Sequence, residues 1–298
     1  MTSNKIIKDT FANYADTFNK YMEQTRQERA KTIPKGLFNA MEYSLSVGGK
    51  RLRPVLCMAS AVSNGLEARQ VLPMALGLEM FHTATLIHDD MPCMDNDVLR
   101  RGMPSCHAKF GETMALLAGD ALIIEGFEWA LYNLELPAEN VLHAFKIITR
   151  AGGASGVCAG QALDIFQEGA EGDPNFVSKI AARKTGDLIS AAVTTSVALA
   201  GSDTERFMCY ESYSRQLGLA FQIVDDILDV VGTKEELGKT IGKDAEEGKL
   251  THVTAYGLDK ARQMAGEASS KAREIISRFE KQDSFLSLLP EYLVDRTR

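Results

Sequence analysis

The stretch His88-Asp89-Asp90-Met91-Pro92-Cys93-Met94-Asp95 places three acids within seven residues, after an apolar run and before the basic Leu99-Arg100-Arg101-Gly102. A second acid cluster, Asp225-Asp226-Ile227-Leu228-Asp229, lies far down the chain. Both clusters adjoin long stretches with helical spacing. We expect the two clusters to face each other across one cavity.

The second cluster is predicted to lie on a buried helix. With residues 217–231 placed at about 100° per residue, Gln222, Asp225, Asp226 and Asp229 fall within about 100° of one another. An acidic stripe on a surface helix would simply be solvated, but apolar residues cover the rest of this helix, which indicates burial. Buried carboxylates need cations, since an unpaired buried charge is very costly. Mg²⁺, a hard ion that takes oxygen ligands, suits this stripe.

The first cluster cannot form one continuous helical face. Asp89 shares its face with His82 and Thr85, whereas Asp95 lies about 240° further round. Pro92 also disfavours an uninterrupted helix. We therefore expect the helix to end or kink here, so that the chain doubles back and brings Asp95 towards Asp89. A solvated or capping loop is the alternative.

Two carboxylate sets of this kind indicate a polyanionic substrate, because Mg²⁺ is commonly held by a few carboxylates together with substrate phosphates. The segment Gly48–Pro54 places three cations on a glycine-rich turn before a helix, where turn amides and arginine forks suit phosphate. Each cation alone could be a solvated surface charge. The further cationic candidates near the acids or at breaks between helices are Arg100, Arg101, Lys184, Lys239, Lys243 and Lys249.

Composition excludes several function classes. The net charge of −7 argues against a nucleic-acid binder, and no Walker A, Rossmann, zinc-ligand or Ser-His-Asp pattern is present. Five cysteines without a CxxC pair are typical of reduced thiols in a cytoplasmic protein. The N-terminal segment lacks a signal-peptide h-region, and no apolar run is long enough to span a membrane.

The pattern of helical stretches predicts one all-α domain over residues 1–298, a single large helical bundle with its site at one end. Long loops are expected at 92–111 and 232–250, directly after the two acid clusters, where long loops are usually functional or disordered. The expected helices cover about 5–31, 34–47, a segment from Pro54, a segment from Pro73 to the first acids, 113–135, 138–151, 154–168, 175–200, 204–231, 258–280 and 283–294.

The two clusters, Asp89-Asp90-x4-Asp95 and Asp225-Asp226-x2-Asp229, resemble the aspartate-rich motifs of the short-chain trans-prenyl diphosphate synthases, the farnesyl and geranylgeranyl diphosphate synthases of the bacterial type. The resemblance implies an isoprenoid synthase-type bundle with a central cavity, a homodimer, and Mg²⁺, as three ions with bound diphosphate. It spans nearly the whole chain through the segments GGKRLRP, LRRG, KFGE, LAGDAL, Gly160-Gln161-x2-Asp164, KTG, LGKTIGKD and DRTR.

The resemblance also implies residue roles. The implied metal ligands are Asp89, Asp95 and Asp225, supported by Asp90, Asp226 and Asp229. The implied site for isopentenyl diphosphate consists of Lys50, Arg53, His82 and Arg101. The implied cations for the allylic diphosphate are Arg100, Lys184 and Lys239, with Lys249 as a further candidate. The residues implied beside the developing allylic cation are Thr185 and Gln222.

The implied reaction is ionisation, condensation and elimination. The allylic diphosphate leaves, the double bond of isopentenyl diphosphate attacks the carbocation, and a proton is lost. A class I terpene cyclase is the remote alternative, but it usually lacks a second DDxxD motif. A non-catalytic subunit would be expected to lose one motif. The chain departs from the family pattern at Thr251-His252-Val253, where Thr-Tyr-Pro is common.

Product length is predicted from the residues before the first acids. Ala84, where bacterial farnesyl synthases commonly carry an aromatic residue, and Thr85 are both small. The next large residue is Phe81, about 12 Å from Asp89 along a helix. This spacing favours a twenty-carbon geranylgeranyl product over fifteen-carbon farnesyl diphosphate, which remains the alternative.

Overall fold

The chain is a bundle of α-helices, as predicted. The computed structural model describes residues 3–167, 175–232 and 249–295. Its helices are α1 (Ser3–Arg29), α2 (Lys35–Ser46), α3 (Leu52–Ser63), η1 (Ala68–Val71), α4 (Leu72–Asp89), α5 (Cys106–Phe110), α6 (Glu112–Asn133), α7 (Ala138–Gly152), α8 (Val157–Phe166), α9 (Phe176–Ala181), η2 (Ala182–Gly186), α10 (Asp187–Leu199), α11 (Thr204–Val231), α14 (His252–Tyr256), α15 (Leu258–Ile276) and α16 (Phe285–Val294).

Local signals in the sequence start several of these helices. Pro54 and Pro73 stand in the first turn of α3 and α4, where the missing proline N–H costs nothing. The side chain of Asp203 caps α11 by accepting a hydrogen bond from the backbone N–H of Arg206 at 2.8 Å. Thr251 caps α14 in the same way through the N–H of Thr254. Of these signals, Pro54 and Pro73 predicted the starts of their helices to within two residues.

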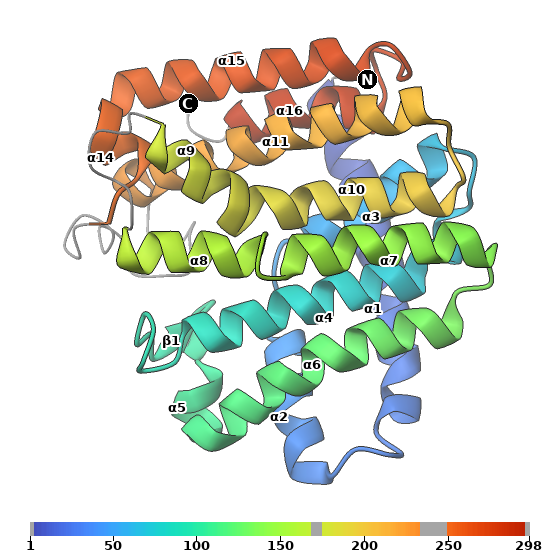
Figure 1. Cartoon of the computed structure of the whole chain (residues 1–298), viewed down its shortest axis with the longest axis vertical. Coiled ribbons are helices and arrows are strands. Elements are labelled where there is room, and N and C mark those ends of the chain that lie inside the picture. The colour runs from blue at the N-terminus through green and yellow to red at the C-terminus, as the bar shows by residue number, and fades with distance from the viewer. Residues whose placement is uncertain (1–2, 168–174, 233–248, 296–298) are drawn as a thin grey trace.

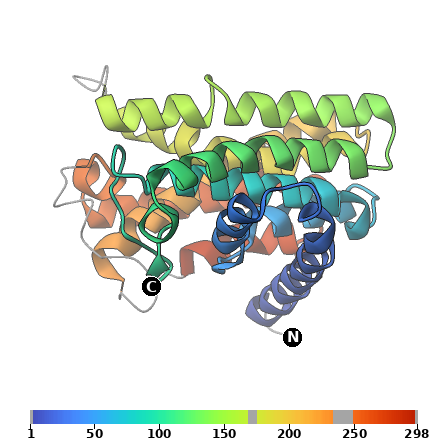
Figure 2. The same cartoon turned by 90° about the horizontal axis from the view of Figure 1, so that it is seen from below.

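The helices run in roughly parallel rows (Figure 1). Helices α7 and α8 follow one another as one row, and α9 leads through η2 into α10 beside it. Helix α4 packs on α6, and α11 packs on α15. The view from below shows the row of α7 and α8 on the opposite side of the bundle from the N-terminal end of α1 (Figure 2). The C-terminal ends of α4, α8 and α11 lie at the same end of the bundle, where α14 also lies.

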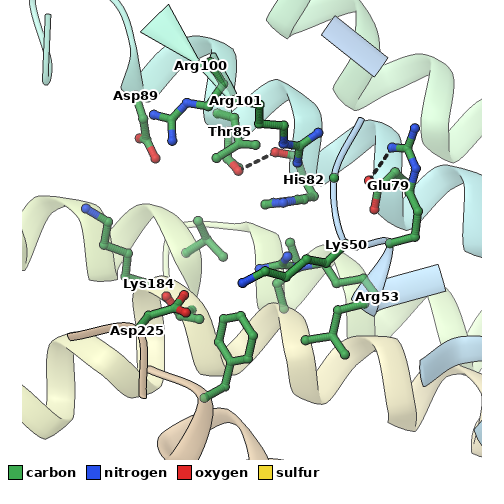
Figure 3. Close-up of a pocket in the computed structure, with 18 of the residues that line it drawn as sticks. Lys50, Arg53, Glu79, His82, Thr85, Asp89, Arg100, Arg101, Lys184 and Asp225 are labelled. Atoms are coloured by element: carbon green, nitrogen blue, oxygen red, sulfur yellow. Dashed lines mark hydrogen bonds and ion pairs between the residues drawn. The ribbon is translucent and has the colours of Figure 1, made fainter. Parts of the chain in front are cut away.

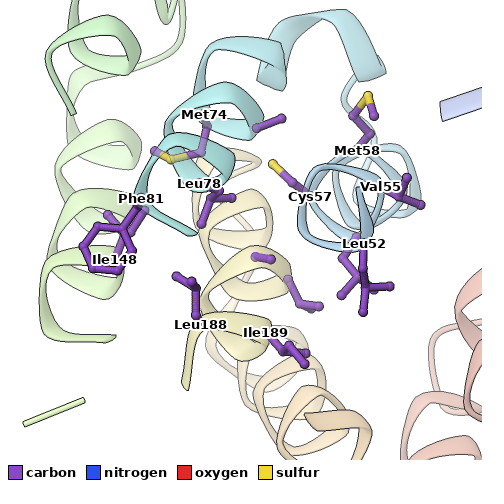
Figure 4. Packing of buried hydrophobic residues seen from close by; sticks show 14 of the residues in the cluster. Leu52, Val55, Cys57, Met58, Met74, Leu78, Phe81, Ile148, Leu188 and Ile189 are labelled. Carbon is purple, nitrogen blue, oxygen red and sulfur yellow. The ribbon is translucent and has the colours of Figure 1, made fainter. Parts of the chain in front are cut away.

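A continuous apolar core joins distant parts of the chain. One cluster of buried side chains extends from Ile7 in α1 to Leu293 in α16. Figure 4 shows its centre, where Leu78 of α4 lies near Cys57 of α3 and Leu188 of α10. Helix α4 is buried along nearly its whole length and is therefore a fixed support for the residues at its end.

The structure differs from the expected helices in several places, and α14 is a helix that was not expected. Within 92–111, Leu99–Arg100 (β1) and Met103–Pro104 (β2) pair as a short antiparallel hairpin, and α5 follows. The stretch 175–200 is not one regular α-helix, because residues 182–186 form a π-helical turn. Helix α15 ends at Ile276, before the expected end at 280. Neither a two-residue strand nor an extra residue in a helix leaves a readable period in the sequence.

Three further expectations concern the loop 232–250, the cysteines and a possible membrane span. Lys239, Lys243 and most of the expected loop 232–250 lie outside the described residues. All five cysteines are free thiols. In the part of the chain that the structure describes, no helix combines the length and apolar character needed to cross a bilayer.

Candidate active site

The end of α4 turns the chain back on itself. The helix ends at Asp89, and the backbone N–H of Asp95 donates to the carbonyl of Asp89 at 2.9 Å. The N–H of Asp97 likewise donates to the carbonyl of Asp90 at 3.1 Å. The predicted break before Pro92 is confirmed, and it brings the third acid of the cluster next to the first.

Two adjoining cavities open at this end of the bundle. The larger, of about 520 Å³, has Asp89 of α4 and Asp225 of α11 on opposite walls (Figure 3). The smaller, of about 240 Å³, shares both acids and adds Asp95 and Gln222. The expectation that the two clusters face each other across one cavity is therefore correct for Asp89 and Asp225.

Burial and crowding make Asp89 a carboxylate that requires cations. Burial, together with the neighbouring Asp95, raises the pKa of Asp89 to about 6, although Lys184 opposes the shift. Within the described residues, no group of three or more acids, histidines or cysteines converges as a protein-only metal site would. The all-oxygen donors on both walls fit Mg²⁺, which keeps part of its coordination for substrate oxygens. A metal here would be held by Asp89, Asp95 and Asp225 together with a bound anion.

The second acid of the first pair binds an arginine of the hairpin. Asp90 is 2% exposed and accepts from Nε of Arg100 at 3.0 and 3.1 Å, and also from Nη2. Burial alone would lower the pKa of Arg100, but the bond to Asp90 raises it. Arg100 lines both cavities. Asp90 therefore fixes a permanently charged fork at the cavity wall.

The second acid of the other pair binds an amide, a backbone N–H and a histidine ring. Asp226 accepts from Nε2 of Gln222 at 2.8 Å and from the backbone N–H of His252 at 2.9 Å. The ring nitrogen Nδ1 of His252 lies 2.8 Å from the same carboxylate oxygen as that N–H. Asp229, one turn further along α11, is 3% exposed and is not among the described residues that line the two cavities.

The turn before α3 places all three of its cations in the lining of the larger cavity. Arg51 is buried and adopts a left-handed backbone with φ of 50°. Its guanidinium bonds to Glu79 at 2.8 Å and to the carbonyl of Leu45. Arg51 thus lines the cavity with its guanidinium already bound to protein groups, beside Lys50 and Arg53. Burial lowers the pKa of Arg53 to about 10.

Arg101 completes this group by lying over the backbone of the turn. A Cβ atom on Gly49 would come within 2.5 Å of the guanidinium carbon of Arg101, so glycine makes room for it. His82 lines the same cavity, and burial followed by the charges of Arg53 and Arg101 lowers its pKa well below the usual value. Figure 3 shows Lys50, Arg53 and His82 grouped away from Asp89 and Lys184. The predicted residues thus form two cationic groups.

The second cationic group depends on the π-helical turn η2. The turn contains Lys184 and Thr185, which both line the larger cavity. Its backbone lies against Gly160 of α8. A Cβ added at Gly160 would come within 2.2 Å of the backbone nitrogen of Lys184. Nζ of Lys184 lies 2.5 Å from Oδ2 of Asp164, and Nζ of Lys249 lies 3.3 Å from Oδ1 of Asp95.

Asp164 is a cavity residue without a predicted role. It lines the smaller cavity, and its carboxylate holds Lys184. The segment Gly160-Gln161-x2-Asp164 was the available signal, since it was recognised as part of the resemblance. Its spacing alone does not show that α8 meets η2, because that contact depends on how two helices pack.

The three residues predicted to set product length are not equivalent. Thr85 lines the larger cavity, where its hydroxyl donates to the carbonyl of His82 at 2.8 Å. Ala84 is completely buried in the core, and Phe81 stacks on Phe127 with ring centroids 6.0 Å apart. Neither of these two is among the described residues that line the cavity. Thr85 is therefore the cavity-wall residue of the three.

An all-α bundle with facing carboxylates and two cationic groups around one cavity is suited to binding polyanions. The family profile described as "Polyprenyl synthetase" matches residues 34–289. The chain belongs to the polyprenyl synthetase family. This membership confirms the predicted family of short-chain prenyl diphosphate synthases and the predicted enzyme class, a prenyltransferase.

Curated relatives include proteins with different stated products. The chain is 38% identical to a dimethylallyltranstransferase from Fischerella ambigua, over 98% of this chain and 88% of that protein. It is 39% identical to a geranylgeranyl diphosphate synthase from Cyanophora paradoxa, over 89% of this chain and 91% of the relative. It is also 38% identical to a farnesyl diphosphate synthase from Micrococcus luteus, over 88% of this chain and 90% of that protein. Similarity of this degree does not distinguish the two product lengths.

Solved structures show the same fold. A geranyltransferase from Legionella pneumophila superposes with a TM-score of 0.87 at 29% identity, over 99% of each chain. The geranyltransferase from Helicobacter pylori, in complex with magnesium and isoprenyl diphosphate, superposes with a TM-score of 0.80 at 30% identity, over 94% of this chain and 96% of that one. The family is one of magnesium-dependent prenyltransferases.

Proposed function

We propose that the chain condenses isopentenyl diphosphate with allylic diphosphates to give an all-trans prenyl diphosphate, with geranylgeranyl diphosphate as the main product. The observation that supports the proposal is the pair of cationic groups on one cavity. One group lies near the facing acids, and the other lies at the turn before α3. One diphosphate would occupy each group. The Asp89, Asp95 and Asp225 carboxylates would hold Mg²⁺, as three ions when diphosphate is bound.

The group near the turn would bind isopentenyl diphosphate through Lys50, Arg53, His82 and Arg101. Its three cations neutralise the headgroup. The lowered pKa of His82 keeps the imidazole neutral, so that it serves as a hydrogen-bonding partner rather than as a charge. Gly49 supports this group, because the guanidinium of Arg101 occupies the space that any other side chain would need.

The group at the other end would bind the allylic diphosphate through Arg100 and Lys184, with Lys239 and Lys249 as further cations. Bound Mg²⁺ supplies additional positive charge that stabilises the leaving diphosphate. Arg100 and Lys184 act in the same sense from fixed positions, because Asp90 and Asp164 hold them at the wall. The acids Asp90, Asp226 and Asp229 would support the site.

The middle of the cavity suits a carbocation. Thr185 and Gln222 would face the developing charge with oxygen dipoles, and the π-bond of isopentenyl diphosphate would attack from the other group. The proton lost afterwards would pass to the released diphosphate. Apolar side chains of Leu86, Leu188 and Phe221 line the larger cavity and reduce access of water, which would otherwise quench the cation.

Incubation with isopentenyl diphosphate, an allylic diphosphate and Mg²⁺, followed by extraction and chromatography, tests the proposal. A twenty-carbon prenyl diphosphate as the main product is expected. A fifteen-carbon product would support farnesyl diphosphate synthesis instead. A hydrocarbon would support a class I terpene cyclase, and no product would contradict an enzymatic role.

We also propose that residues 1–298 form one catalytic domain that works as a cytosolic homodimer. Helix α6 carries a row of exposed apolar side chains that a second copy would cover, namely Leu116, Leu117, Ile124, Leu131 and Tyr132. Size-exclusion chromatography with light scattering tests the assembly. Ile124→Glu is expected to favour the monomer, whereas Val62→Glu, at an exposed site on α3, serves as the matched control.

A further inference from the structure

His252 and Asp226 form a buried contact between α14 and α11. The side chain of His252 is completely buried, and its Nδ1 lies 2.8 Å from Oδ2 of Asp226. A carboxylate can only accept, so Nδ1 of His252 carries the hydrogen of this bond. The cap formed by Thr251 fixes the start of α14 and with it the position of the ring.

The other oxygen of Asp226 determines the orientation of a neighbouring amide. It accepts from Nε2 of Gln222 at 2.8 Å. A carboxamide has one donor end and one acceptor end, and the reverse orientation would place two acceptors against each other. The amide oxygen of Gln222 is therefore the polar end that is left for the cavity, which this residue lines.

We propose that His252 is a positioning residue for catalysis: through Asp226 it holds the amide of Gln222 with its oxygen towards the developing allylic cation. The inference rests on the proposed function, in which Gln222 lies beside that cation. The chain of contacts runs from a ring outside the reacting atoms, through a carboxylate, to a neutral dipole. His252 thus affects the rate of ionisation and not the binding of isopentenyl diphosphate.

A double-mutant experiment separates this role from simple packing. His252→Phe keeps a ring in the core but removes the Nδ1 donor, whereas His252→Asn keeps an N–H donor near the same place. Both changes are made in the wild-type chain and in a Gln222→Leu chain. Steady-state kinetics with both diphosphates and thermal unfolding are measured for every variant.

The expected result is a kcat about tenfold lower for His252→Phe, a KM for isopentenyl diphosphate within about twofold of wild type, and recovery to within about threefold for His252→Asn. In the Gln222→Leu chain, His252→Phe should change kcat by less than about twofold, because the residues act as one unit. If His252→Phe does not fold, His252→Leu in both chains gives the same comparison, because leucine also lacks a side-chain donor.

Three outcomes overturn the inference. An equal loss of kcat from His252→Phe in both chains means that the ring acts through packing alone. An Asn variant as slow as the Phe variant means that the donor is irrelevant. Both outcomes leave the role of Gln222 intact. An unchanged kcat for Gln222→Leu removes the proposed role of Gln222 and the inference together.

Discussion

In both tandem aspartate pairs one acid lines the larger cavity and the other binds protein groups, but the groups that are bound differ. In each pair the first acid, Asp89 or Asp225, lines the larger cavity, and the second acid, Asp90 or Asp226, is buried against protein donors. Asp90 binds the cation of Arg100, whereas Asp226 binds a neutral amide and an imidazole. The first pair therefore presents a charge to the cavity, and the second pair presents a dipole.

This difference follows from where each pair lies. Asp90 stands at the end of α4, where the chain leaves the helix and the hairpin returns within reach. Asp226 lies inside an unbroken helix, so its partners come from one turn earlier on α11 and from α14. A helix end gives access to a long, charged side chain, whereas a helix interior favours short contacts. The same dipeptide thus acquires two functions from its position.

The largest expected effect comes from the two acids that face the cavity. Asp89→Asn and Asp225→Asn should each lower kcat/KM by about a thousandfold, because each removes a charge that the substrate complex needs. Initial rates at several magnesium concentrations measure the effect, and circular dichroism verifies the fold. A loss smaller than about tenfold in either variant would contradict the shared role of the first acids.

The second acids should have smaller and unequal effects. Asp90→Asn should lower kcat about a hundredfold and the free energy of unfolding by about 2 kcal/mol, because the half-buried Arg100 loses its charged partner. Asp226→Asn should lower kcat about tenfold, since this carboxylate holds an amide, a backbone N–H and a histidine ring but no arginine. Kinetics and urea unfolding measure both quantities. Equal losses in the two variants would remove the distinction between charge and dipole.

Two neighbouring residues of α4, the helix that carries the first pair, should control product length. Thr85→Phe places a ring in the wall of the cavity and should shorten the main product by one isoprene unit. Ala84→Tyr should also shorten it, as the sequence predicts, but with a lower unfolding temperature because Ala84 is completely buried. Product chromatography and thermal unfolding make the comparison. A twenty-carbon product from Thr85→Phe would show that the tail does not pass this residue.

Glu125 on α6 provides a carboxylate buried outside the cavity, where the expected effect is on stability alone. Burial raises its pKa from 4.5 to about 7, although Arg29 opposes the shift. The folded state therefore holds this proton more tightly, and the free energy of unfolding falls as the pH rises from about 4.5 to 7.

Glu125→Gln removes this dependence. The free energy of unfolding of the variant should match that of the wild type near pH 4.5. At pH 8 it should exceed that of the wild type by about 1–2 kcal/mol, after allowance for the partial exposure of the side chain. Thermal unfolding across this range, together with unchanged turnover, checks the prediction. A variant less stable than the wild type at pH 8 would mean that the ion pair with Arg29 outweighs burial.

Much of the fold and the principal acids could be predicted from the sequence. The narrow polar stripe on residues 217–231 identified a buried helix, and Pro92 identified the break that brings Asp95 to Asp89. Both inferences depend on the helical period and on proline geometry, which are local properties. The helix starts at Pro54 and Pro73 were predicted for the same reason.

Contacts between elements could not be predicted in this way. The pairing of Lys184 with Asp164 depends on how α8 packs against η2. The binding of the Arg51 guanidinium to Glu79, a residue of another helix, accompanies a left-handed backbone at Arg51. Arg100 lies ten residues from its partner Asp90, and His252 lies 26 residues from its partner Asp226. Residue spacing contains no information about such pairs.

The π-helical turn at 182–186 can be regarded as one residue inserted into an otherwise regular α-helix. Deleting one residue there would restore the regular helix and rotate everything before the turn by about 100° relative to α10. Lys184 would then leave the cavity although the composition of the segment had hardly changed. The position of Lys184 in the cavity thus depends on the number of residues in this segment. A deletion would remove the lysine from the cavity without any substitution.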